Sequence, residues 1–195
     1  MNIINEKYQD IVREAKDLFW RYGIKKVTVE EICAKAGVSR VTFYKYFDNK
    51  EKLALNIIKA IVEDGMKEYD KIMKSEVAYP VKVQKIIELK IRSSGELSSD
   101  LLKDLFGSDF PEIQEFYRRT TFNNLRIFEN DIRDAQWNGD IRKDIKVEFI
   151  MFILNRMVEM ARDENLNAIY SSVGDLLTEL TRFFFYGVIK TDKDI

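Results

Sequence analysis

A chain of 195 residues in which 46% of the side chains are hydrophobic has ample apolar material for a core. It contains no histidine and one cysteine, Cys33, so the commonest general base, a Cys–His pair and a disulfide framework are all excluded. Neither a glycine-rich phosphate loop nor a zinc-ligand spacing occurs, and we expect no metal and no cofactor. The composition argues against an enzyme, and a carboxylate-only active site is the alternative left open.

The net charge of −1 hides an uneven distribution. Residues 1–60 contain twelve Lys or Arg against eight Asp or Glu, a balance of +4, and the remainder has a balance of −5. The N-terminal part is therefore better suited to a polyanion. The lone Cys33 indicates a reduced, cytoplasmic setting. We expect neither a signal peptide nor a membrane span, because no apolar run approaches the roughly 20 residues that a spanning helix needs.

The first predicted helix spans residues 8–22 and ends at Gly23. Its apolar side chains recur at helical spacing and share one face: Ile11, Ala15, Leu18, Phe19 and Tyr22. This helix should brace the segment that follows it. Lys25 and Lys26 lie in the next connection, where phosphate contact and simple solvation both stay open.

A second helix is predicted from Thr28. Thr28 is suited to an N-cap, and Glu31 three residues later completes the capping-box pattern. The apolar stripe of this helix comprises Val29, Ile32, Cys33 and Ala36. Gly37 is suited to the left-handed conformation that ends many helices, and Ser39 can cap the next one. Two short helices joined by a glycine turn are the parts of a DNA-binding helix-turn-helix.

The third helix can be divided into faces at roughly 100° per residue. Phe43 and Phe47 share the inner side. The outer side is assigned to base reading, because Arg pairs with guanine, valine methyls pack on thymine and Thr serves either base edge; it carries Arg40, Val41, Thr42 and Lys45. Contacts to the DNA backbone are assigned to Tyr44, Tyr46 and Lys50, with Lys50 as the phosphate clamp. The alternative, a solvated corner of a helical protein, does not explain outward Val41 and two tyrosines.

Helix follows helix in the rest of the chain. A long helix over about 49–73 should connect two domains, and tilting it would move the recognition helix. Further helices are expected over 81–92, 101–107, 111–137, 145–162 and 173–189, with a polar turn that contains Gly95 between the first two. We therefore predict an all-α fold of about nine helices, with a DNA-binding domain over 1–48 and an effector-binding and dimerisation domain over 49–195.

The last two predicted helices have wide apolar faces, which suit either a core or a four-helix dimer interface. The residues assigned to a dimer interface are Phe149, Ile153, Met157, Leu176, Leu180, Phe183 and Phe184. The pattern by itself leaves core and interface equally open. A two-fold dimer would place two recognition helices about one DNA turn apart, roughly 34 to 36 Å, on a palindromic site.

The segment AGVSRVTFYKYFDNKEKL resembles the N-terminal signature of TetR/AcrR-family transcriptional regulators, and the likeness is specific over residues 8–56. The resemblance implies a three-helix DNA-binding domain, a larger helical domain that binds an effector, and a homodimer made by the last two helices.

Residue by residue, the resemblance puts Thr42, Tyr44 and Tyr46 where such regulators touch DNA. It puts Lys50 at their phosphate clamp and Thr28 where the preceding helix meets the DNA backbone. Val41 stands where glycine is frequent in the family and Phe43 where leucine is usual. These two departures bear on specificity or packing, and not on the fold.

The sequence thus predicts a cytoplasmic homodimer that regulates transcription, a repressor released from a palindromic double-stranded DNA operator by a small-molecule effector. The alternative is a DNA-binding protein of the same fold that acts without a small ligand, as an activator or as a non-transcriptional DNA-binding or interaction protein. Effector-dependent release of DNA distinguishes the two. The effector and its binding residues are not assigned.

Overall fold

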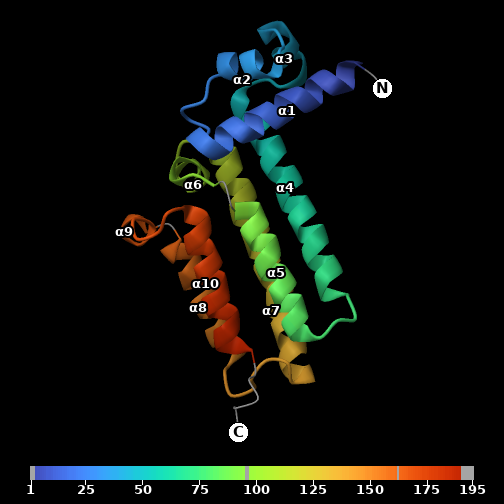
Figure 1. The fold of residues 1–195 in the computed structure, drawn as a ribbon, viewed down its shortest axis with the longest axis vertical. Helices are drawn as coiled ribbons and strands as arrows, with labels where there is room; N and C mark the ends of the chain where they lie inside the picture. The colour runs from blue at the N-terminus through green and yellow to red at the C-terminus, as the bar shows by residue number, and fades with distance from the viewer. Residues whose placement is uncertain (1–2, 95–96, 162, 190–195) are drawn as a thin grey trace. The chain divides into compact units, whose positions relative to one another are not determined.

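The computed structural model describes residues 3–94, 97–161 and 163–189 (Figure 1). Over these ranges the chain forms ten helices and no strand, apart from one isolated bridge between Ile141 and Ile189. The predicted all-α fold is confirmed. Gly95 in the expected polar turn and Arg162 at an expected helix end lie outside the described residues.

The first three helices are α1 (Ile3–Tyr22), α2 (Val29–Ala36) and α3 (Arg40–Tyr46), and all three occur where the sequence predicts them. α1 begins before residue 8, where the expected helix starts. Gly23 (φ 80°) and Gly37 (φ 63°) adopt the left-handed backbone that a side chain with a Cβ rarely takes. Each glycine therefore provides the turn that ends α1 or α2.

The middle of the chain forms α4 (Lys50–Met73), α5 (Tyr79–Ser94), α6 (Ser99–Phe106) and α7 (Pro111–Asn138). α5 begins before Pro80 because proline is tolerated in the first turn of a helix, where its missing N–H has no partner to lose. α6 begins before residue 101 because the Ser98 hydroxyl accepts from the Leu101 N–H and caps it.

The end of the described chain forms α8 (Val147–Met160), α9 (Glu164–Asn167) and α10 (Val173–Val188). α9 was not expected. It is a single turn capped by Asp163, too short to show an apolar period. None of the described helices is long and apolar enough to cross a membrane.

The packing divides the chain into two compact units. Unit 1 comprises Met1–Asp64 and Glu96–Tyr117, and unit 2 comprises Gly65–Gly95 and Arg118–Ile195. Unit 1 therefore includes α6 and the first turns of α7 as well as α1, α2, α3 and α4 as far as Asp64. The functional division at residues 48 and 49 stays a prediction, because the units are defined by packing alone.

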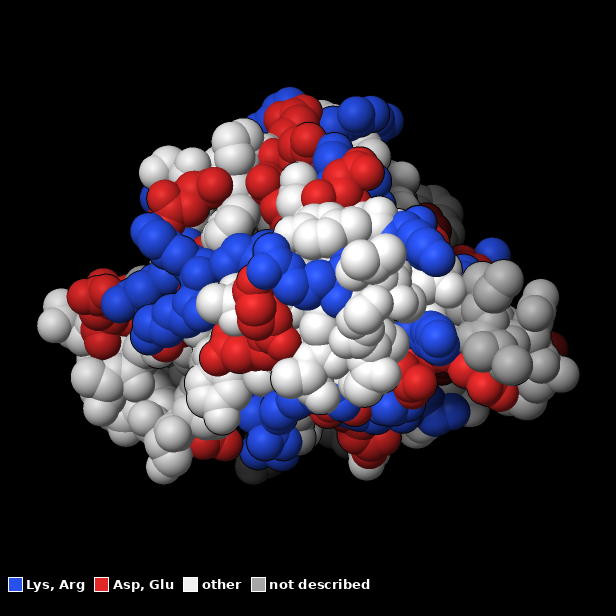
Figure 2. Space-filling view, turned by 90° about the horizontal axis from the view of Figure 1, so that it is seen from above, with Lys and Arg blue, Asp and Glu red and all other residues white. Residues whose placement is uncertain are grey.

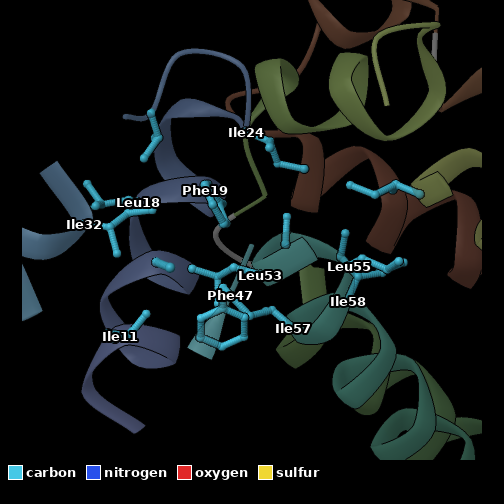
Figure 3. Packing of buried hydrophobic residues seen from close by; sticks show 14 of the residues in the cluster. Ile11, Leu18, Phe19, Ile24, Ile32, Phe47, Leu53, Leu55, Ile57 and Ile58 are labelled. Atoms are coloured by element: carbon cyan, nitrogen blue, oxygen red, sulfur yellow. The ribbon is translucent and has the colours of Figure 1, made fainter. Parts of the chain in front are cut away.

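The core of unit 1 joins α1–α3 to α4 and to α6 (Figure 3). Phe19 from α1, Ile32 from α2 and Phe43 from α3 are almost fully buried. Leu53 of α4 and Leu101 of α6 belong to the same cluster. The inner side of the helix-turn-helix therefore packs on side chains of α1, α4 and α6, which are far apart in the sequence.

The core of unit 2 forms where α10 packs against α5 and α8. Its buried members come from α5, α7, α8 and α10, for example Val83, Ile132, Ile150 and Phe184, and from the connection between α7 and α8, which contributes Ile141. Phe128, Phe184 and Phe185 make ring contacts at centroid distances of 5.4 to 6.2 Å. This unit is held mainly by apolar contacts between long helices.

Candidate nucleic-acid interface

The start of α2 is fixed by the capping box that the sequence predicts. The Thr28 hydroxyl accepts from the Glu31 N–H at 3.2 Å, and a Glu31 carboxylate oxygen accepts from the Thr28 N–H at 2.7 Å. The Thr28 hydroxyl also donates to that carboxylate at 2.8 Å. Donation from the Thr28 N–H, and then from its hydroxyl, lowers the pKa of Glu31. Thr28 is exposed at this helix start, and its contact with a DNA backbone stays a prediction.

α3 has one buried and one exposed side, as its sequence predicts. Ser39 caps it by accepting from the Thr42 N–H at 3.1 Å, and Phe43 and Phe47 are buried on its inner side. Val41 is 70% exposed and Tyr44 is 48% exposed. An apolar side chain and a phenol ring therefore stand in solvent on the outer side of a helix of only seven residues.

The remaining base-reading candidates flank that surface. Arg40 is exposed and pairs with Glu30 of α2 at 2.8 Å. Lys45 is exposed, and Thr42 is half-buried with its hydroxyl 3.0 Å from the Ser39 hydroxyl. An exposed ion pair such as Arg40–Glu30 contributes only about 0 to 1 kcal/mol, so Arg40 can exchange its partner at small cost.

Tyr46 lies on the shoulder of α3 that turns toward α1. It is half-buried, and its ring meets the Tyr8 ring edge-on at a centroid distance of 5.8 Å. The Tyr8 hydroxyl in turn donates to Asn56 Oδ1 of α4 at 3.0 Å. Tyr46 therefore also joins α3 to its supporting helices, and its predicted contact with DNA is untested.

Lys50 has a partner set that sequence reasoning missed. Its ammonium nitrogen lies 2.7 Å from the Ile24 carbonyl oxygen, 2.9 Å from that of Lys25 and 2.6 Å from that of Val27. Burial is the main cause that lowers the pKa of Lys50. A lysine has three N–H donors, so all of them are engaged with the connection between α1 and α2. The phosphate-clamp role stays a prediction.

Lys25 and Lys26 do not stand alone in solvent. Lys25 Nζ pairs with Asp109 at 2.7 Å, and Lys26 Nζ pairs with Asp100 of α6 at 2.7 Å. No local sequence signal could have found these pairs, because the partners are more than 70 residues apart along the chain.

Figure 2 looks down on the part of unit 1 that carries α1–α3 and shows blue, red and white side chains interspersed. Basic side chains form a band across part of this face, beside uncharged ones. Affinity for a polyanion would thus come from a limited number of placed contacts, rather than from a continuous basic surface.

The seven dimer candidates of α8 and α10 divide by burial within unit 2. Phe149 and Phe183 are exposed, whereas Ile153 and Leu180 are half-buried. The remaining three are buried in the chain's own core: Met157, Leu176 and Phe184. The sequence missed Phe152 and Tyr186 as exposed aromatics, because helical spacing alone does not separate the outer edge of an apolar face from its centre.

Unit 2 also contains an open groove of about 390 Å³ between α4 and α5. Its lining is largely charged and includes Glu68, Lys71, Lys85, Glu88 and Arg92. Among the described residues, no group of three or more acidic or cysteine side chains is placed to hold a metal ion.

Three comparisons place these features among known proteins. A family model described as bacterial regulatory proteins of the tetR family matches residues 11–57. The HTH-type transcriptional regulator YerO of Bacillus subtilis is 24% identical over 143 residues, which are 70% of this chain and 49% of YerO. The chain therefore matches about half the length of that relative.

The HTH-type transcriptional repressor KstR2 of Rhodococcus jostii is 23% identical over 145 residues, or 70% of each chain. A solved structure of the transcriptional regulator FadR from Bacillus subtilis, in complex with stearoyl-CoA, superimposes with a TM-score of 0.68. The likeness covers 92% of this chain and 98% of that one. Because the two sequences are only 16% identical, it shows a shared fold and nothing further. The matched helix-turn-helix and the relatives support a TetR/AcrR-family transcriptional regulator, and the solved structure shares the fold of this chain.

Proposed function

We propose that this protein binds a palindromic DNA operator as a homodimer, with α3 in the major groove, and represses transcription until a small-molecule effector releases it. The match of residues 11–57 to the tetR-family model and the similarity to the transcriptional regulator YerO support DNA binding. The similar repressor KstR2 supports repression, and the similar FadR structure, which holds stearoyl-CoA, supports a small ligand.

The observation that carries the DNA-binding part is the outer side of α3. Val41 and Tyr44 are exposed on it next to Arg40 and Lys45, while Phe43 behind them is fully buried. A valine methyl fits a thymine methyl, and Arg pairs with guanine. A rigid, capped helix with this mixture of groups is suited to base edges and poorly suited to water.

Within this proposal, Arg40, Val41, Thr42 and Lys45 read bases, whereas Thr28, Tyr44 and Tyr46 contact the DNA backbone. Lys50 acts through the connection whose carbonyls it binds. A direct phosphate contact would cost it at least one of its three carbonyl partners.

The experiment selects the preferred duplex from a random pool with the full chain, and then measures the affinity of variants. Val41→Ala should lower affinity for the selected duplex by about tenfold, with a smaller loss on duplexes altered at the base it reads. Tyr44→Phe should weaken all duplexes alike. Equal loss on every duplex from Val41→Ala would reject its base-reading role.

Salt dependence separates the two roles of Lys50. If the ammonium clamps a phosphate, Lys50→Met reduces the slope of log affinity against log salt by about 1. If it positions the 24–27 connection, the affinity falls while the slope stays nearly unchanged. We expect the second result.

The proposed dimer uses the exposed aromatic side chains of the last two long helices. Phe149 and Phe152 lie on α8, and Phe183 and Tyr186 lie on α10, all more than half exposed. Isolated surface aromatics are common, but four on two helices that contact each other are suited to a hydrophobic interface. This interface replaces the buried members of the sequence-predicted set.

Phe183→Ser tests the interface by sedimentation. We expect the mass to fall from that of a dimer to that of a monomer of 23.0 kDa, without loss of helix content. Arg182→Ser, at the adjacent exposed position, serves as the control. A Phe183→Ser chain that remains a dimer would move the interface elsewhere.

The repressor part is tested by release. A duplex selected by the full chain is challenged with a library of small organic molecules that includes acyl-coenzyme A esters. Loss of binding on addition of one compound supports effector-controlled repression. Binding that no compound alters, together with activation of a reporter by the bound protein, favours the ligand-independent alternative.

A further inference from the structure

The connection between α1 and α2 is held by groups from a distant part of the chain. Asp104 of α6 accepts from the backbone N–H of Lys25 at 2.9 Å. It is only 7% exposed, and it is the one charged residue found buried among the described side chains. A buried carboxylate without partners costs several kcal/mol, so a hydrogen bond here is a strong constraint on both segments.

Gly23 allows the two segments to approach this closely. A Cβ at Gly23 would lie 2.6 Å from Asp104 Oδ2 and 3.1 Å from the Cβ of Asp100. The backbone there also has a φ of 80°. Any side chain at Gly23 would therefore strain the turn and push α6 away from it.

Other contacts join the same two segments. The Ser98 N–H, just before α6, donates to the carbonyl oxygen of Trp20 at the end of α1 at 3.0 Å. Asp100 and Asp109 pair with Lys26 and Lys25. Apolar side chains of α6, of α7 and of the connection between them enter the unit 1 core beside them: Leu101, Leu105, Phe110 and Ile113.

Lys50 holds the connection from the other side. Its ammonium binds the carbonyl oxygens of Ile24, Lys25 and Val27, while Asp104 binds the N–H of Lys25. The peptide groups that lead into Thr28 thus have both donors and acceptors engaged by side chains of opposite charge. Thr28 then begins α2, so the direction of α2 depends on this short connection.

We propose that Asp104 is a positioning residue for DNA binding, which holds the connection over residues 23–28 and through it the start of α2. This inference rests on the proposed function of α2 and α3. α6 lies beyond residues 11–57, which match the family model, yet it completes the DNA-binding unit of this chain.

The experiment compares three variants of the full chain. Asp104→Ala removes the acceptor. Asp104→Asn keeps an oxygen acceptor for the Lys25 N–H, and Asp109→Ala removes only the exposed pair with Lys25. The readouts are hydrogen exchange of the Lys25 amide and of residues 28–31, and affinity for the duplex selected by the wild-type chain, both well below the unfolding temperature.

Asp104→Ala should speed the exchange of the Lys25 amide and weaken DNA binding, each by about tenfold, with an unchanged salt slope because no phosphate contact is lost. Asp104→Asn should restore most of both, and Asp109→Ala should change neither by more than roughly threefold. Rescue by the conservative variant separates positioning from a general loss of folding.

Asp104→Ala protein that is folded and binds DNA as tightly as wild type overturns the proposal, whatever its exchange rate. Unchanged exchange of the Lys25 amide overturns it as well. A wild-type chain that enriches no duplex instead overturns the proposed function, and the exchange measurement then tests the held connection by itself.

Discussion

Unit 1 and unit 2 place their exposed apolar side chains differently. On the outer side of α3 in unit 1, Val41 and Tyr44 stand between charged neighbours on a short helix. In unit 2 exposed aromatics occur along long helices, with Phe149 on α8 and Phe183 on α10, and with Phe122 and Trp137 on α7. The first arrangement is suited to a polar partner with apolar spots, such as a DNA groove, and the second to another apolar helix face.

The two units also differ in how polar groups hold their connections. The turn that leads into α2 is tied by the Asp104 carboxylate and the Lys50 ammonium. In unit 2 the Gln136 amide donates to the carbonyl oxygens of Arg142 and Ile145, and Lys82 Nζ donates to that of Met73. The turn into α2 differs because groups of opposite charge hold it and one of them, Asp104, is buried. We conclude that replacing these two charged groups should weaken unit 1, whereas the core of unit 2 depends chiefly on apolar volume.

The largest effect is expected from Phe43→Ala. Phe43 is fully buried, so its removal should cost about 3–5 kcal/mol of the free energy of unfolding of unit 1. The measurement is urea unfolding followed by Trp20 fluorescence in a Trp137→Phe background. Trp137 is 84% exposed and can be replaced at little cost, which leaves Trp20 as the reporter of unit 1.

Tyr44→Ala, at the next position, is the control for Phe43→Ala. It should lower the free energy of unfolding by less than about 1 kcal/mol, since the ring is half exposed. Equal destabilisation by the two substitutions would contradict the assignment of inner and outer sides of α3.

A second large effect is expected in unit 2 from Leu176→Ala. Leu176 is almost fully buried within the chain, so a loss of roughly 2–5 kcal/mol should appear even in the monomeric Phe183→Ser background. Thermal unfolding by circular dichroism measures it. A loss of stability that appears only at concentrations where the chain dimerises would instead assign Leu176 to the dimer interface.

An intermediate effect is expected from Lys50→Met, which leaves three carbonyl groups without their donor. The free energy of unfolding of unit 1 should fall by about 2 kcal/mol. Lys52→Met is the matched control, because Lys52 makes an exposed pair with Glu112, and such pairs contribute about 0 to 1 kcal/mol. Urea unfolding followed by Trp20 fluorescence compares the two variants. An equal loss of unfolding free energy in Lys50→Met and Lys52→Met would contradict the structural role of Lys50.

The smallest effect concerns pH. The Thr28 N–H and then the Thr28 hydroxyl donate to the Glu31 carboxylate and lower its pKa below the ordinary value. The stabilisation of the α2 start is therefore fully present above the ordinary pKa, and it is lost as the pH falls through the lowered folded value. Thr28 amide shifts, followed by NMR from neutral pH into that acidic range, should report the loss.

Glu31→Gln removes the titrating carboxylate and should abolish this transition in the Thr28 amide shift. A transition of the same size in the variant would assign it to another acid.

Much of unit 1 could be predicted from the sequence because its signals are local. The Thr28–Glu31 cap, the Gly37 turn and the buried Phe43 follow from backbone hydrogen bonding and helical periodicity within a few residues. In unit 2 the sequence predicted where most helices lie, but not which of their apolar side chains are exposed. An apolar helix face has the same sequence pattern whether it packs on its own core or on a partner. Met157 and Phe149 illustrate this, as one is buried and the other exposed.

By itself, the sequence determined the all-α fold, the helix-turn-helix and the outward side of α3, because each depends on residues close together along the chain. Only the tertiary structure decided that α6 packs in the same unit as α1–α3. It also decided that Lys50 and Asp104 form hydrogen bonds with the same connection, residues 23–28. Lys50 and Asp104 lie on different helices, and Asp104 reaches the Lys25 N–H across 79 positions of sequence. Such a pairing has no local pattern, because it arises only when packing brings two distant helices to the same turn.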